Sequence, residues 1–211
     1  VLGLATGTTP LGLYSELIKD HKENGTSYKN IKTVNLDEYA GLDIESDQSY
    51  VYFMRHNLFE GLDIDLKNTN IENGKAEDKE KECERYNNLL GEMQQDIQLL
   101  GLGSNGHIAF NEPNTPFGSG VHIVKLTENT IKDNSRLFAN INDVPRYAFT
   151  MGIKNIMNAK KIVILASGKN KANAVKASVE GAVTEDVPAS VLQLHPDCTF
   201  IVDEEAASLL K

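Results

Sequence analysis

Cysteine is scarce in this chain of 211 residues, and tryptophan is absent. The two cysteines, Cys83 and Cys198, lie far apart and form neither a CxxC redox motif nor the close spacing of a zinc site. Isolated cysteines are typical of proteins in a reducing compartment. The cysteine pattern therefore predicts a cytoplasmic location and gives no support for a bound metal.

Long apolar runs are also lacking. No stretch approaches the roughly 20 residues that cross a bilayer, so the sequence predicts no membrane-spanning segment. The opening residues, Val1 to Leu4, lack the basic flank and the cleavage site of a signal peptide. Because they have the apolar character of a core strand, we expect the natural chain to begin further upstream.

Positive charge is in deficit, with 21 lysines and arginines against 30 aspartates and glutamates and a formal net charge of −9. Nucleic acids and anionic membranes are polyanions, and neither is attracted without a concentrated basic patch. The sequence therefore predicts no nucleic-acid or membrane partner. Any anionic ligand must be held by a few local groups.

Hydrophobic residues make up 40% of the chain, which is enough to build the core of one large α/β domain over residues 1–211. Apolar runs alternate with amphipathic stretches, as in a single-domain, Rossmann-like three-layer α/β/α fold with a mostly parallel sheet. Ligands of such folds bind at the carboxyl ends of the strands. The predicted strands span residues 1–5, 31–36, 97–100, 121–126, 162–166 and 199–202, and the predicted helices follow Thr9 or span about 47–59, 77–95 and 169–180.

The segment 126–146 is polar and interrupted, unlike the stretches on either side of it. Two interpretations remain open for it. It is a candidate mobile lid over a ligand, or it is an ordinary surface connection.

The first predicted strand ends in a group of small polar residues. Gly7, Thr8 and Thr9 offer backbone N–H groups and hydroxyls at the positive end of a helix, an arrangement suited to phosphate. Thr9 is a natural N-cap with Pro10 at the first helical position, so a plain helix cap is the alternative.

The second predicted strand ends in two adjacent carboxylates, Asp37 and Glu38. Neighbouring side chains at a strand exit point in different directions, so one can face a pocket while the other makes structural contacts. A pair of acids in this place is also typical of a turn or a helix cap.

A glycine-rich turn follows the third strand and leads into His107 and Glu112. A histidine titrates near neutral pH, and a nearby carboxylate can fix its tautomer and raise its pKa, which indicates a proton-transfer site. The glycines also fit a dinucleotide-binding fingerprint, but the prolines that follow interrupt the helix such a site requires. No second histidine stands at metal-ligand spacing.

At this point the sequence resembles the glucosamine-6-phosphate deaminase family over essentially the whole chain. The resemblance rests on five ordered motifs: LATGTTP at 4–10, NLDEY at 35–39, GSNGHIAFNEP at 103–113, NSR at 134–136 and LQLHP at 192–196. The first and third motifs are shared in looser form with 6-phosphogluconolactonases. Asp-Glu-Tyr in the second motif and Phe-Asn-Glu-Pro in the third are specific to the deaminases.

The resemblance implies conversion of glucosamine 6-phosphate and water to fructose 6-phosphate and ammonia, with no metal or organic cofactor. It implies that His107, assisted by Glu112, opens the sugar ring, and that Asp37 moves a proton from C2 to C1 of the open chain. The phosphate-binding residues that it implies are Gly7, Thr8, Thr9, Arg136 and Lys171.

This chain departs from many relatives at Asn105, where they have aspartate. An amide cannot stabilise an imidazolium by charge, so we expect His107 to be less basic here and ring opening to depend more on Glu112. Residues of an N-acetylglucosamine 6-phosphate effector site are also missing, so we expect no such activation. The sequence leaves open a monomer or a homo-oligomer, and two other functions: a 6-phosphogluconolactonase-type hydrolase, or a sugar-phosphate-binding domain without catalysis.

Overall fold

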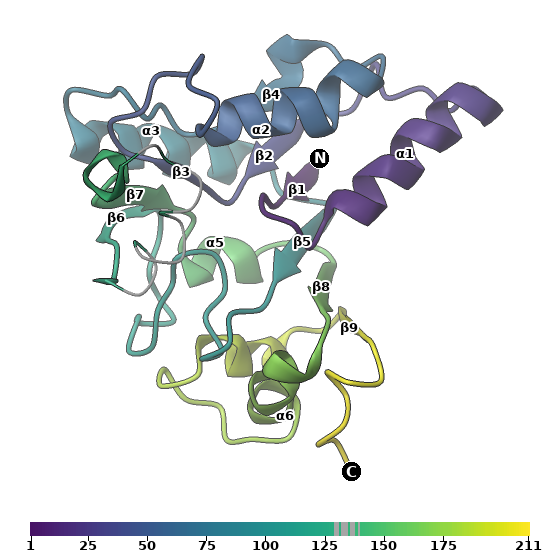
Figure 1. Ribbon diagram of the computed structural model, residues 1–211, viewed down its shortest axis with the longest axis vertical. Helices are drawn as coiled ribbons and strands as arrows, with labels where there is room; N and C mark the ends of the chain where they lie inside the picture. Colours follow the sequence, from purple (N-terminus) through teal and green to yellow (C-terminus); the bar gives the residue numbers. More distant parts are fainter. Residues whose placement is uncertain (129–130, 132–134, 136–137, 139) are drawn as a thin grey trace.

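The computed structural model describes residues 1–128, 131, 135, 138 and 140–211, and this part of the chain forms two β-sheets. The larger sheet has six strands, and every neighbouring pair is parallel. The predicted mostly parallel sheet is therefore confirmed. From one edge to the other the strands are β4 (Thr69–Asn70), β2 (Thr33–Asn35), β1 (Leu2–Leu4), β5 (Ile97–Gly101), β8 (Ile162–Ala166) and β9 (Cys198–Val202) (Figure 1).

Helices cover both faces of this sheet. Leu99 and Leu100 are neighbours on β5 but belong to two different apolar clusters, so the sheet separates the clusters. The Leu99 cluster includes residues of two helices, and the Leu100 cluster includes residues of three others. These are α1 (Leu11–Asn24) and α2 (Tyr50–Asn57) on the first face, and α3 (Lys79–Glu92), α5 (Ile153–Met157) and α6 (Ala172–Val179) on the second.

Local sequence signals set the ends of three of these helices. Ser49 precedes α2 and accepts a hydrogen bond from the Tyr52 backbone N–H at 3.0 Å. Asp78 does the same for α3, accepting from Lys81 at 3.0 Å. α1 ends at Gly25, whose φ of 73° is the left-handed conformation that favours glycine at this place.

The start of α1 differs from the prediction. The helix begins at Leu11, Pro10 precedes it without any side-chain cap, and Thr9 stays exposed in the preceding loop. The Pro10 carbonyl accepts the first helical hydrogen bond, from the Tyr14 N–H at 3.0 Å, so the helix starts one position later than a Thr9 cap requires. The prediction of Thr9 as N-cap was wrong, which leaves its hydroxyl available at the strand end.

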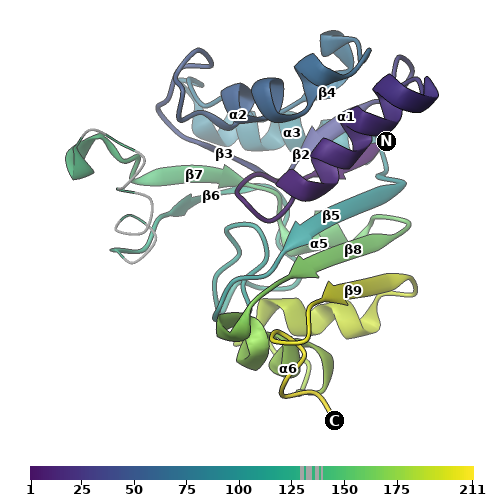
Figure 2. The same ribbon diagram turned by 45° about the vertical axis from the view of Figure 1, so that its right-hand side comes forward.

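A smaller antiparallel sheet projects from the main one, as Figure 2 shows. It contains β3 (Asp37–Tyr39), β7 (Tyr147–Thr150) and β6 (His122–Lys125) in that order. Asp37 and Glu38 were expected just beyond the end of a strand, with a turn or a helix cap as one open interpretation. A turn is excluded, because the chain continues past Leu36 into a second strand. Burial between elements overrides the low strand propensity of the two acids.

Besides β3, three further strands or α-helices among the described residues were not predicted from the sequence: β4, β7 and α5. Each has five residues or fewer, too short for a periodic pattern to be recognised. Within the candidate lid, a short 3₁₀ turn spans Ile141–Asp143. Much of the rest of that segment lies outside the described residues.

The order of the strands reverses at β1. The chain passes from β1 to β2 and β4 on one side, and then returns to β5, β8 and β9 on the other. In open parallel sheets, ligands bind in the crevice beyond the carboxyl ends of strands at such a reversal. The fold therefore places the ends of β1 and β5 where a ligand site is expected.

Candidate active site

A cavity of about 330 Å³ opens at the carboxyl ends of β1 and β5. Its walls bring together residues that the sequence places more than 160 positions apart. Five of the residues predicted for the site line it: Gly7, Thr9, Asp37, His107 and Lys171. The geometry thus unites the three strand ends that the sequence singled out.

One side of this cavity is suited to an anion. Gly7, Thr8 and Thr9 are exposed in the loop before α1, and Thr8 lies with Thr9 and Lys171 around an adjoining hollow. The buried phenol of Tyr14 holds Ala5, at the start of this loop. It donates to the Ala5 carbonyl at 2.5 Å and accepts from the Ala5 N–H at 3.2 Å. The start of a helix and a lysine therefore meet beside a rigid strand end.

Lys171 reaches this place from a 3₁₀ turn, Lys169–Lys171, which leads into α6. Partial burial lowers the pKa of the Lys171 ammonium below its usual value. A desolvated ammonium gains more from an anionic partner than a hydrated one does. Arg136, the other cation predicted for the phosphate, lies outside the described residues.

Asp37 enters the cavity from β3, the first strand of the smaller sheet, where it pairs with Thr150 of β7. The residue is 7% exposed. Burial, and next the charge of Glu38, raise the pKa of the Asp37 carboxyl to about 8. A carboxyl with a pKa near the working pH can both accept and return a proton.

Its neighbour Glu38 has a different environment. The Glu38 carboxylate accepts backbone hydrogen bonds from Tyr39 at 2.8 Å and from Tyr50 and Val51 at 3.0 Å each. Tyr50 and Val51 are the first residues of α2, so Glu38 holds the start of that helix. Burial raises its pKa to about 7 even so. Of the two adjacent acids, Asp37 therefore faces the cavity, whereas Glu38 makes structural hydrogen bonds, as expected for neighbours on a strand.

His107, which lines the cavity, forms a hydrogen-bonded chain with Asn105 and Glu112, which do not line it. Asn105 Oδ1 lies 2.7 Å from His107 Nδ1, and Asn105 Nδ2 donates to Glu112 Oε2 at 2.8 Å. Glu112 itself is 3.7 Å from the imidazole. Because the amide oxygen is only an acceptor, Nδ1 carries the hydrogen, and Nε2 is left as the base.

Glu112 does raise the pKa of His107, as expected of a nearby carboxylate, but it neither fixes the tautomer nor decides the net direction. Asn105, not Glu112, makes the direct contact. Burial lowers the pKa of His107, Glu112 raises it, and the Lys171 charge lowers it further, with a net decrease. The lowered pKa favours the neutral imidazole.

Glycine is required at two positions of this loop. A Cβ atom at Gly103 would lie 2.3 Å from the His107 ring, and Gly106 has a φ of 85°. The Gly103 N–H donates to the His107 carbonyl at 2.9 Å, which closes the turn. The glycines therefore serve the packing of the histidine rather than a dinucleotide.

Asn105 gives a direct test of this electrostatic arrangement. In an Asn105→Asp variant a carboxylate would face the imidazole, so we expect the pKa of His107 to rise relative to the wild-type protein. The measurement is an NMR titration of the His107 Cε1 proton. An unchanged or lower pKa in the variant would show that the 105 side chain does not control His107.

Sequence reasoning missed two aromatic residues of the cavity, Tyr50 and Phe110. Phe110 belongs to a motif that the sequence did single out, so its place in the motif was a usable signal. Tyr50 comes from the start of α2, and no local pattern connects that position with the site.

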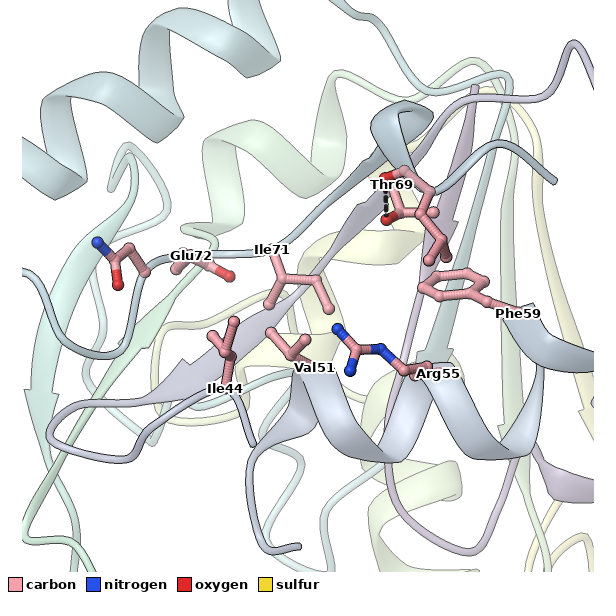
Figure 3. Close-up of a pocket in the computed structure, with 9 residues that line it drawn as sticks. Ile44, Val51, Arg55, Phe59, Thr69, Ile71 and Glu72 are labelled. Atoms are coloured by element: carbon pink, nitrogen blue, oxygen red, sulfur yellow. Dashed lines mark hydrogen bonds between the residues drawn. The ribbon is translucent and has the colours of Figure 1, made fainter. Parts of the chain in front are cut away.

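A second cavity, of about 270 Å³, lies between α2 and the segment around β4. Figure 3 shows Arg55 extending from α2 into this cavity and Glu72 at one end of it. Arg55 pairs with Glu45, at 3.2 Å. None of the predicted site residues lines this cavity, so the first cavity is the candidate active site.

Among the described residues, no group of three or more histidine, cysteine, aspartate or glutamate side chains is placed to hold a metal ion. No helix in this part of the chain has the length and apolar character to cross a membrane.

The fold and the site define a class: a doubly wound α/β protein in which a buried carboxyl, a histidine and a lysine line one cavity at the strand reversal. The chain belongs to the family described as glucosamine-6-phosphate isomerases/6-phosphogluconolactonase, whose model matches residues 1–201.

Similar proteins include glucosamine-6-phosphate deaminases of Thermoanaerobacter pseudethanolicus, 53% identical over all of this chain and 83% of the relative, and of Clostridium perfringens strain 13, 51% identical over all of this chain and 88% of the relative. The solved structure of a monomeric glucosamine-6-phosphate deaminase superposes with a TM-score of 0.95 at 50% identity, over 99% of this chain and 87% of that one. A 6-phosphogluconolactonase from Thermotoga maritima shares the fold alone, with a TM-score of 0.74 at 21% identity over 95% of this chain and 84% of that one.

Proposed function

We propose that this protein is a glucosamine-6-phosphate deaminase that converts glucosamine 6-phosphate and water to fructose 6-phosphate and ammonia. Relatives of that name are about half identical to it over its whole length. The observation that carries the proposal is the position of Asp37, a buried carboxyl that lines the same cavity as His107.

In this proposal the phosphate binds at the start of α1. Backbone N–H groups and hydroxyls of Gly7, Thr8 and Thr9 donate to its oxygens, and Lys171 adds a positive charge. Arg136 completes the set as a predicted contact. These local donors explain how a protein with a net charge of −9 holds an anion.

The first chemical step is opening of the sugar ring. Nε2 of His107 takes the proton of the C1 hydroxyl and delivers it to the ring oxygen, which leaves C1 as an aldehyde. Asn105 holds the imidazole in the tautomer that this requires, and Glu112 behind it stabilises the transient imidazolium.

The second step belongs to Asp37. Its carboxylate takes the proton from C2, which carries the amino group, and returns it to C1. As this proton moves, the C1 carbonyl oxygen takes up a proton and becomes a hydroxyl, and the amine nitrogen loses one. The C2–N bond thereby becomes a C=N bond, which water hydrolyses to a ketone with release of ammonia. Every step is a proton transfer or a hydrolysis, so the proposal needs no metal or organic cofactor.

We include a cytoplasmic location in the proposal. The two cysteines are free thiols in the structure, as is typical of a reducing compartment.

A coupled assay for ammonia tests this function. Glucosamine 6-phosphate should give ammonia and fructose 6-phosphate in equal amounts, and the N-acetylated sugar phosphate should give none. The same preparation is assayed with 6-phosphogluconolactone, because a lactonase would use the histidine but needs no C2 base. Lactone hydrolysis without ammonia release would replace the proposal with a lactonase. Calorimetric binding of the amino-sugar phosphate without turnover would replace it with a binding domain.

A further inference from the structure

The end of β7 contacts both halves of the candidate site. Thr150 pairs with Asp37 across the smaller sheet, and the N–H of the next residue, Met151, donates to the Leu36 carbonyl at 2.6 Å. Thr150 and Met151 are both fully buried. The backbone that carries Asp37 is therefore fixed to this strand end.

The same two residues hold the loop that carries His107. The Phe110 N–H donates to the Thr150 hydroxyl at 3.1 Å, and the buried amide of Asn111 donates to the Met151 carbonyl at 2.9 Å. Asn111 also donates to the Ile108 carbonyl at 2.9 Å, which closes the loop on itself. The last residue of β7 and the residue after it thus anchor two consecutive residues of the loop.

This loop needs external support because one of its residues is strained. Ala109 has a φ of 52°, in the left-handed region that a residue with a Cβ atom rarely adopts, and it lines the cavity. Such a conformation persists only where the surrounding structure over-determines it. The hydrogen bonds to Thr150 and Met151 flank Ala109 on its C-terminal side.

We infer that Thr150 is a positioning residue that sets the spacing between Asp37 and His107. Its backbone keeps the register of the Asp37 strand, and its hydroxyl accepts the N–H of the loop, so one residue ties the two groups together. A β-branched side chain in a strand has restricted χ1 freedom, which suits this role. The catalytic part of the inference rests on the proposed function.

The test compares Thr150→Val, which keeps the shape and removes the hydroxyl, with Thr150→Ser, which keeps the hydroxyl. We expect Thr150→Val to lower kcat for ammonia release roughly 10- to 100-fold with KM changed less than about twofold, because displaced acid–base groups lose rate rather than binding. Its His107 Cε1 proton should shift in the NMR spectrum. Thr150→Ser should restore both readouts.

Thr33→Val is the matched control. Thr33 is also buried, but its hydroxyl has no hydrogen-bond partner among the described residues. We expect this variant to keep the wild-type kcat and His107 resonance. Equal losses in Thr33→Val and Thr150→Val would assign the effect to general core damage and overturn the inference.

The NMR measurement tests the positioning role of Thr150 independently of the proposed function. A wild-type protein that releases no ammonia refutes the proposed function, yet the His107 resonance still reports whether Thr150 positions the loop. A resonance and a kcat unchanged in Thr150→Val overturn the inference while leaving the function intact. If Thr150→Val does not fold, Thr150→Cys replaces it, since a thiol of similar size is a weak acceptor.

Discussion

Replacing Asp37 with asparagine should lower kcat for ammonia release from glucosamine 6-phosphate by about 10²–10⁴-fold. The amide has nearly the same shape as the carboxyl, but it cannot accept the C2 proton. The proposed phosphate contacts come from other residues, so we expect KM to change little. Steady-state ammonia assays measure both constants, and calorimetry measures binding of the sugar phosphate to the variant.

The wild-type pH profile provides a second test of Asp37. Only the ionised carboxyl is a base, and its pKa is raised to about 8. We therefore expect kcat/KM to rise with pH up to about that value, after correction for the titration of the substrate amine. Full ammonia release by Asp37→Asn would remove the C2 proton acceptor from the mechanism.

Replacing Glu72 with leucine should stabilise the folded protein. Glu72 is 1% exposed, and neither carboxyl oxygen has a hydrogen-bond partner outside Glu72 itself among the described residues. A buried polar group in that state costs about 1–3 kcal/mol. Apolar side chains such as Val51 and Ile71 line the adjoining cavity, so a leucine is compatible with the site (Figure 3).

The pH dependence of this gain has a definite sign. Burial, and to a lesser extent the charges of Asp37, Glu38 and Glu82, raise the pKa of Glu72 well above its usual 4.5. Above pH 4.5 the unfolded chain releases this proton while the folded chain retains it, so the wild-type protein loses stability as pH rises. The advantage of the leucine variant should widen by up to about 1.4 kcal/mol per pH unit until the folded-state pKa is reached.

Glu82 is the matched control for Glu72, because it is buried but fully partnered. Its carboxylate accepts from Arg85 at 2.6 and 2.7 Å and from the Asn73 N–H at 2.7 Å. Glu82→Leu should therefore destabilise the fold, by about 1–3 kcal/mol. Urea denaturation of both variants between pH 5 and 8 measures these changes. A loss of stability in Glu72→Leu at neutral pH would mean that Glu72 has a stabilising partner.

The sequence alone determined the strands with strong local patterns. β8 was predicted with its observed bounds, because Ile162–Ala166 is an uninterrupted apolar run between polar residues. The glycine turn was also recognised, since glycine has few roles other than tight geometry. By contrast, β3 was not recognised, because Asp37 and Glu38 become strand residues only when β7 pairs with them. Such pairing joins residues more than 100 positions apart, and no local pattern encodes it.

The residue types of the candidate site were likewise determined by the sequence, but their relationships were not. A histidine, an amide and a glutamate within eight positions predicted proton transfer, yet only the fold placed Asn105 between His107 and Glu112. The pKa of His107 decreased because burial outweighs the charge of Glu112, and burial is a property of the packed chain. The amino-acid sequence determined which groups are present, and the tertiary structure decided which of them are in contact and how strongly each holds its proton.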